Sequence, residues 1–276
     1  KFHSGALEKE VYRAAVAILV SSVTGEPSSS AGSELSENRP EFDALTPRNR
    51  AASMLTIWEE MLCDVMRNDP RVIALDGDLS YDTGTHLARH LFPDRYIQAG
   101  IAEQDMVSMA GTLALSGHIP MVHSFSTFMT MRATEQIFNN ATEYSRIIYL
   151  GFLSGVVPSA PGFSHQAVTD VGIMSSIPGM RVFEPSCQSE LRWAVAEALG
   201  HSGPSFIRMG GLSPLPEIPA AGAINERRSG KDVALVASGP LFSSLALDAA
   251  DELQAHDVDA SVFTMVDLLG EPFGPH

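Results

Sequence analysis

Residues 71–125 read RVIALDGDLSYDTGTHLARHLFPDRYIQAGIAEQDMVSMAGTLALSGHIPMVHSF. Short runs with strand character occur here and further along the chain, at 71–78, 95–100, 119–125, 146–152, 180–185 and 205–210. Helix-like stretches separate several of these runs, at 102–116, 130–143 and 187–199. Strands and helices that alternate at this spacing indicate crossover connections between parallel strands. The sequence therefore predicts an α/β fold with a doubly wound, mostly parallel sheet.

The composition changes on both sides of this core. Residues 21–47 are rich in Ser, Gly, Pro and Glu, which predicts a linker, and an amphipathic helix is expected over 48–70. A proline-rich break at 211–230 precedes a strand-like run, a helix-like stretch at 241–255 and a strand-like run at 260–267. About fifty residues cannot close a second doubly wound sheet. We therefore expect 229–276 to be the opening of a further α/β domain.

The charge balance argues against two classes of partner. Asp and Glu number 33 against 18 Lys and Arg, a formal net charge of −15, and no basic run interrupts this excess. A protein of this charge repels nucleic-acid phosphates and anionic lipid, so neither partner is expected. The apolar stretch after Arg13 is too short for a membrane span, and Glu8 and Glu10 replace the basic region of a signal peptide. Two cysteines without a disulfide or metal pattern suit the cytoplasm.

Glu103 is the first candidate for chemistry. It follows the strand-like run 95–100 and lies in the first turn of the helix expected over 102–116. Open α/β sheets bind ligands where strands end and helices begin, so a carboxylate there can face a ligand. From the spacing alone, however, Glu103 and Asp105 can equally serve to complement the helix dipole.

Five motifs, in order along more than a hundred residues, make the chain recognisable. They are GIAEQ at 100–104, STF at 126–128 with RATEQI at 132–137, GFSHQAVTD at 162–170, IPGMRVFEP at 177–185 and GPSFIR at 203–208. Together they resemble the pyrimidine-binding domain of the transketolase group of thiamine-diphosphate enzymes. The resemblance implies three parts: the tail of a preceding diphosphate-binding half with a linker (1–47), the pyrimidine-binding domain (48–212), and a linker with part of a transketolase C-terminal α/β domain (213–276).

The resemblance also implies roles for individual residues. Glu103 would hydrogen-bond the aminopyrimidine ring of thiamine diphosphate and favour the tautomer that removes the thiazolium proton, and Phe128 would stack on that ring. Ile101 and Asp78 would lie beside the cofactor. His165 would reach the substrate oxygen and shuttle its proton. His3, in a segment resembling the end of the diphosphate-binding half, would contact the cofactor's phosphate and the substrate. Arg50 and Arg208, with His165, would bind the substrate and its phosphate.

The chain departs from the family's pattern in ways that concern the substrate. Pro161 stands where the family usually has an acidic residue that binds a donor hydroxyl, and Asp82 stands where a serine binds phosphate. The segment 153–160 lacks the family's Thr-His-Asp run. These changes favour a modified acceptor or a non-phosphorylated donor. The run Asp76-Gly-Asp78 lacks the downstream Asn of the family's metal motif, so no metal ligand is expected on this chain.

The resemblance implies a transferase that moves a two-carbon ketol unit from a ketose to an aldehyde. It would be active only with the diphosphate-binding half, which would supply the Mg²⁺ ligands, as a dimer of heterodimers acting on a small sugar or keto substrate. The alternatives are a decarboxylating relative, of the deoxyxylulose-phosphate synthase or 2-oxoacid dehydrogenase beta-subunit type, and a non-catalytic scaffold subunit. A buried Glu103 would favour an enzyme, and a solvent-exposed Glu103 would favour the scaffold.

Overall fold

A six-stranded parallel sheet forms the centre of the fold. The computed structural model describes residues 53–157, 162–210, 213–219 and 221–270. The strands of this sheet are β1 (Val72–Asp76), β2 (Tyr96–Gln98), β3 (Ile119–Phe125), β4 (Ile148–Ser154), β5 (Arg181–Phe183) and β6 (Ser205–Gly210). Their order is β2-β1-β3-β4-β6-β5, and every neighbouring pair is parallel. All six coincide with runs that the sequence predicts to be strands.

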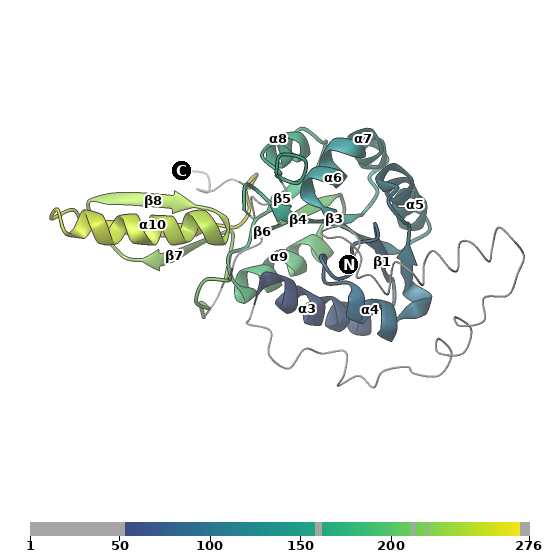
Figure 1. Ribbon diagram of the computed structural model, residues 1–276, viewed down its shortest axis with the longest axis horizontal. Coiled ribbons are helices and arrows are strands. Elements are labelled where there is room, and N and C mark those ends of the chain that lie inside the picture. The colour runs from purple at the N-terminus through teal and green to yellow at the C-terminus, as the bar shows by residue number, and fades with distance from the viewer. Residues whose placement is uncertain (1–52, 158–161, 211–212, 220, 271–276) are drawn as a thin grey trace, which may run out of the picture. The chain divides into compact units, whose positions relative to one another are not determined.

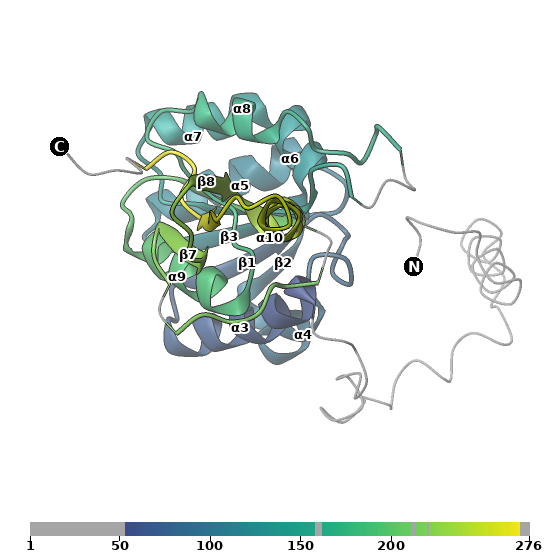
Figure 2. The ribbon, with the colours of Figure 1, turned by 90° about the vertical axis from the view of Figure 1, so that its left-hand side faces the viewer.

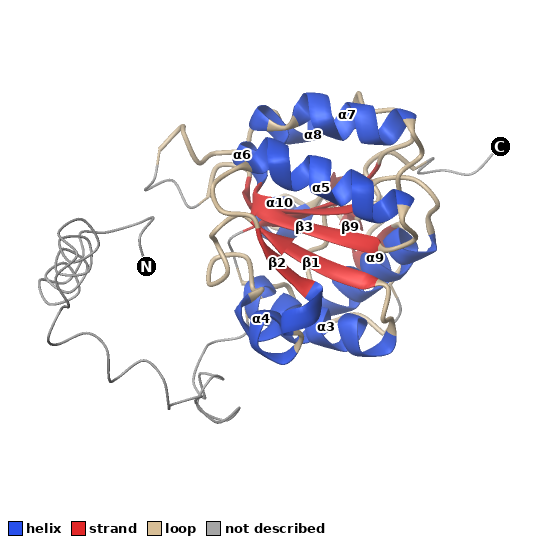
Figure 3. Cartoon of the chain, turned by 90° about the vertical axis from the view of Figure 1, so that its right-hand side faces the viewer, coloured by secondary structure: helices blue, strands red, loops and turns tan. Residues whose placement is uncertain are grey.

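Helices cover both faces of the sheet, as Figures 1 and 3 show. One face carries α5 (Glu103–Leu115), α6 (Ser126–Arg132), α7 (Thr134–Thr142) and α8 (Asp170–Ser175), and the view in Figure 2 agrees. The other face carries α3 (Met54–Asn68), α4 (His86–Leu91) and α9 (Gln188–Gly200). A short 3₁₀ turn, η1 (Pro93–Arg95), leads into β2. Two separate apolar clusters fill the two interlayer spaces, so the predicted doubly wound α/β fold is confirmed.

The helix boundaries differ from the expectation in three places. First, α3 begins only at Met54, because the Ser53 hydroxyl caps it by accepting a hydrogen bond from the Thr56 amide. Second, the single helix expected at 130–143 is two helices, α6 and α7, separated at Ala133, whose φ of −116° is not helical. Third, the short helices α4 and α8 were not expected, because six residues are too few to show a clear periodicity. The consequence for the site is that α6 starts directly where β3 ends.

A smaller layer follows in the chain. It contains β7 (Ile224–Arg228), β8 (Val233–Ala237), α10 (Gly239–Gln254) and β9 (Ala260–Met265), in the strand order β7-β9-β8. Strands β8 and β9 are parallel and joined by α10, as the sequence predicts, whereas β7 pairs with β9 in the antiparallel direction and was not expected. The domain boundaries at 47/48 and 212/213 stay predictions. In the described part of the chain, the helices are too short or too polar to cross a lipid bilayer.

Candidate active site

The strand order places a ligand-binding edge beside β1. This strand pairs with β2 on one side and with β3 on the other, so the chain reverses direction across the sheet at this point. In open α/β sheets the carboxyl ends of strands at such a switch point form the binding crevice. Asp78 follows β1, Glu103 begins the helix after β2, and Phe128 lies in the first turns of the helix after β3. Three of the predicted cofactor residues therefore follow adjacent strands.

Glu103 is a buried carboxylate with a single strong partner. It is the first residue of α5, and only 6% of its side chain is exposed. Its Oε1 atom accepts a hydrogen bond of 2.6 Å from Nη1 of Arg132. Three residues earlier, Gly100 has a φ of +74°, which glycine adopts without strain, and no atom lies within 4 Å of the position of a Cβ. The backbone that leads to Glu103 therefore borders open space.

Phe125, Phe128 and His165 form an aromatic cluster next to Arg132, the residue that binds Glu103. The ring centroids of Phe128 and His165 are 5.0 Å apart, and Phe125 lies 5.4 Å from Phe128 and 5.7 Å from His165. His165 belongs to the loop after β4, and its Nδ1 atom lies 2.9 Å from the hydroxyl of Ser164. The structure thus brings two sequence-predicted residues, Phe128 on α6 and His165 on the loop after β4, into direct ring contact.

Arg132 connects the carboxylate with the aromatic cluster. Its guanidinium carbon lies 3.9 Å from the centre of the Phe128 ring, while the same group binds Glu103. The side-chain amide of Gln104 donates a 3.0 Å hydrogen bond to the backbone carbonyl of Arg132, which fixes the end of α6 against the start of α5. Sequence reasoning quoted Arg132 within a motif but gave it no role. The available signal was its spacing of four residues from Phe128, which places both on one helix face.

Ile101 and Asp78 lie at the same edge with exposed side chains. Asp78 has a φ of +65°, and its amide donates to the Gln98 side-chain oxygen at 2.9 Å. The neighbouring Asp76 is fully buried and accepts from the Leu79 amide at 2.9 Å, so it has a structural role at the end of β1. Both Ile101 and Asp78 are accessible to a ligand or partner, and their cofactor contacts stay predictions.

Arg208 lies in a network of charged groups at the end of β6. Its Nε donates to Asp170 at 2.8 Å, its Nη1 to Glu184, and its Nη2 to the Ala167 carbonyl at 3.2 Å. Burial alone would lower the pKa of Arg208, but the charges of Glu184 and Asp170 raise that pKa above its ordinary value. All three nitrogens of the Arg208 guanidinium already have partners within the chain, and the phosphate contact of Arg208 stays a prediction.

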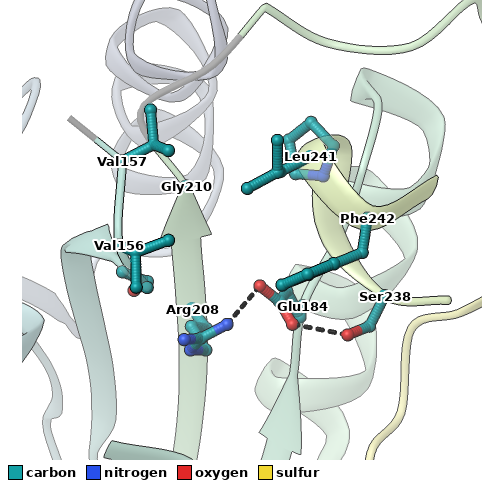
Figure 4. Close-up of a pocket in the computed structure, with 11 residues that line it drawn as sticks. Val156, Val157, Glu184, Arg208, Gly210, Ser238, Leu241 and Phe242 are labelled. Atoms are coloured by element: carbon teal, nitrogen blue, oxygen red, sulfur yellow. Dashed lines mark hydrogen bonds and ion pairs between the residues drawn. The ribbon is translucent and has the colours of Figure 1, made fainter. Parts of the chain in front are cut away.

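A small cavity opens beside this network (Figure 4). It is bordered by Arg208, Glu184, Ser238 and Phe242, and Glu184 also accepts a 2.7 Å hydrogen bond from the Ser238 hydroxyl. Its volume of about 30 Å³ is enough for a water molecule or two, not for a cofactor. The network also reaches α6, because Asp170 accepts a 2.6 Å hydrogen bond from Ser126. Its role in the structure is therefore to hold α6, and with it Phe128, at the edge of the sheet.

Two predicted site residues, His3 and Arg50, lie outside the described residues. Within the described ranges, no group of three or more His, Cys, Asp and Glu side chains is arranged to hold a metal ion.

Large apolar side chains are exposed in the segments that follow β1 to β4. They are Tyr81, Ile101, Met131, Val156, Phe163 and Val168, which we call the apolar rim. A patch of this kind on a globular protein commonly marks an interaction surface. Glu103, Phe128 and His165 lie in the segments after β2, β3 and β4, which also carry most of the apolar rim.

Comparisons with known proteins agree with this geometry. Residues 50–211 match the family model for the transketolase pyrimidine-binding domain. The chain is 32% identical over 215 residues to the 6-deoxy-6-sulfo-D-fructose transketolase subunit SqwH of Clostridium sp. (strain MSTE9), covering 75% of this chain and 66% of that protein. It is 33% identical over 221 residues to the 1-deoxy-D-xylulose-5-phosphate synthase of Anaeromyxobacter sp. (strain K), covering 77% of this chain and 34% of the synthase.

Solved structures of transketolases also resemble this chain. A split-gene transketolase described as an inactive β4 tetramer superimposes with a TM-score of 0.69 at 30% identity, covering 79% of this chain and 73% of that one. A transketolase from Pichia stipitis superimposes with a TM-score of 0.71 at 21% identity, covering 83% of this chain and 38% of that one, and supports the fold alone.

Proposed function

This chain belongs to the transketolase group of thiamine-diphosphate enzymes through its pyrimidine-binding domain, and from that membership we propose that it is one half of a two-part transketolase. The complete enzyme would transfer a two-carbon ketol unit from a ketose to an aldehyde in the cytoplasm. The observation that carries the proposal is Glu103, a buried carboxylate at the switch point of the sheet, which binds the same guanidinium, that of Arg132, that covers the Phe128 ring.

The residues at the edge fit the aminopyrimidine ring of thiamine diphosphate. The cofactor, when bound, supplies a carbanion centre that accepts and donates the two-carbon unit. Glu103 would share a proton with a ring nitrogen, which would replace Arg132 as the hydrogen-bonding partner that this buried carboxylate requires. Phe128 presents an aromatic ring for stacking, and Ile101 adds an exposed apolar side chain. The burial of Glu103 also argues against the alternative that this chain is a non-catalytic scaffold subunit.

His165 is the residue best placed to exchange a proton with the substrate. Its ring makes a tilted contact with Phe125 and an edge contact with Phe128, which keeps it beside the proposed pyrimidine position. An imidazole ring can both accept and donate a proton during a reaction. We therefore assign it to the oxygen of the transferred unit, with His3, Arg50, Arg208 and Asp78 as further predicted contacts.

The diphosphate and its Mg²⁺ would be bound by a partner half. The apolar rim lies in the segments after β1 to β4, which also carry the proposed site, and needs a covering surface; permanent interfaces commonly bury about 2,000 Å² or more. We propose a dimer of heterodimers with the cofactor at each boundary. Light scattering of the co-purified assembly tests this mass, and calorimetric titration of the isolated chain with thiamine diphosphate and Mg²⁺ should give only weak binding. Tight binding to the chain alone would contradict the proposal.

A decarboxylating activity is the second candidate. It is favoured by the 33% identity to a deoxyxylulose-phosphate synthase, which is as high as the identity to the transketolase subunit. The two candidates differ in their donor: a ketose for the transferase, a 2-oxoacid that releases CO₂ for the synthase type. Incubation of the assembly with an aldehyde acceptor and either a ketose with a hydroxyl at C3 or pyruvate, with CO₂ release measured, separates them.

Replacement of the carboxylate tests the site itself. In the assembled enzyme, Glu103→Gln should lower kcat by roughly 10² to 10⁴-fold, because an amide keeps the shape but cannot share the proton. Asp105→Asn is the matched control, since Asp105 lies in the same first turn of α5 but is exposed. If both variants keep similar activity, Glu103 serves only the helix dipole and the assignment of the site is wrong.

A further inference from the structure

We propose that Arg132 is a placeholder: its guanidinium occupies the aminopyrimidine position in the cofactor-free protein and swings out when thiamine diphosphate binds. The inference rests on the proposed function, because it concerns the same site. It goes further because it assigns to Arg132 a role that weakens cofactor binding: this side chain competes with the cofactor ring for the same position.

Arg132 makes both of the contacts that the proposal assigns to the cofactor ring. Its Nη1 donates to Oε1 of Glu103 at 2.6 Å, where the ring nitrogen would bind. Its guanidinium carbon lies 3.9 Å from the centre of the Phe128 ring, where the aminopyrimidine would stack. A guanidinium is planar, cationic and rich in N–H donors, so it satisfies an aromatic face and a carboxylate in the same way as a protonated or amino-substituted heterocycle.

Two planar groups cannot occupy this position together. Phe128 is only 8% exposed, and its remaining neighbours include His165 and Phe125, which approach at tilted or edge angles. The guanidinium therefore covers the ring surface to which a flat ligand would have access. An incoming ring must displace Arg132 from Phe128 and take its hydrogen bond to Glu103.

The side chain is free to make this movement. Arg132 is the last residue of α6, and 45% of its side chain is exposed, in contrast to the 6% of Glu103. An ion pair and a cation–π contact are each weak when one partner is partly exposed. The guanidinium can therefore move into solvent at a small cost in free energy. Until then, the pair keeps the buried Glu103 carboxylate from being left without a partner.

The test is cofactor affinity in the assembled enzyme. Thiamine diphosphate with Mg²⁺ is titrated by calorimetry into the complex of this chain with its diphosphate-binding half, using wild type, Arg132→Met and Arg67→Met. Methionine retains an unbranched side chain without charge or donors. Arg67 is the control because it forms an ion pair of 2.5 Å with Asp64 on a different helix, α3.

We expect Arg132→Met to bind roughly tenfold more tightly than wild type, the combined size of a partly exposed ion pair and cation–π contact, and Arg67→Met to bind as wild type does. Arg132→Lys, which keeps the charge but not the planar face, should lie between them. Weaker or unchanged binding by a folded Arg132→Met overturns the placeholder alone. Absence of binding by the wild-type assembly would overturn both the placeholder and the proposed function.

Discussion

Arg227→Met should lower the free energy of unfolding by about 3 to 5 kcal/mol, because it leaves a buried carboxylate without its cation. Arg227 donates to Glu190 at 2.7 Å, and their side chains are 5% and 0% exposed. Glu190 lies on α9, at the side of the parallel sheet, and Arg227 lies on β7, in the smaller layer. Ser186 and Asn225 also hydrogen-bond Glu190, at 2.7 Å and 3.0 Å, so the carboxylate is surrounded by donors that hold it in place when the arginine is removed.

Urea denaturation followed by tryptophan fluorescence measures this loss. Trp193 lies on the same helix as Glu190 and contacts Phe183, so its emission reports the packing of α9. At a slope of about 2 kcal/mol per M, the midpoint should fall by roughly 1.5 to 2.5 M. Arg67→Met is the control, because its pair with Asp64 is even shorter, at 2.5 Å against 2.7 Å, but its side chains are 58% and 62% exposed, so its loss should cost under about 1 kcal/mol. If the two variants lose similar stability, burial of the Arg227 pair does not matter and the reasoning fails.

Two further predictions concern buried titratable groups. Burial lowers the pKa of His123 from 6.5 to about 4. Between pH 6.5 and about pH 4, His123 is protonated in the unfolded chain but not in the folded chain. The free energy of unfolding should therefore fall by up to roughly 3 kcal/mol as the pH drops through this range, with no further change from this residue below pH 4. In urea titrations His123→Asn should lack this loss, and an identical pH profile would contradict it. Burial likewise raises the pKa of Cys63 to about 12, so Ellman's reagent at pH 8 should modify it only after unfolding, and rapid labelling of the native chain would contradict this.

Much of the fold was predictable because strands of a buried parallel sheet are continuous apolar runs. β1, β3 and β4 are buried along nearly their whole length, and each stood out in the sequence. β7 was missed for the opposite reason. Its sequence INERR is charged, and only the structure shows that Arg227 is covered by α9 and β9. Composition alone cannot distinguish such a strand from a loop.

The candidate site was predictable in part. Glu103, Phe128 and His165 were named from motifs, and the structure places Phe128 and His165 in contact. Arg132 was not given a role, because a motif shows which residues occur but not which side chain fills a site when no ligand is bound. Arg208 shows the same limit. Its partners Asp170 and Glu184 come from separate segments of the chain, and nothing in a linear sequence indicates that they converge on one guanidinium.

The position of β6 in the sheet constrains how the chain can be synthesised and folded. β6 is the last strand of the sheet to be made, yet it lies between β4 and β5. While residues up to about 200 have emerged from the ribosome, the apolar strand β4 has one edge without a neighbour, and β5 has no place to pair. Exposed strand edges of this kind favour association with other chains. The sheet can close only when Ser205–Gly210 inserts between two strands that already exist, so one edge of β4 stays unpaired in a nascent chain until β6 has emerged.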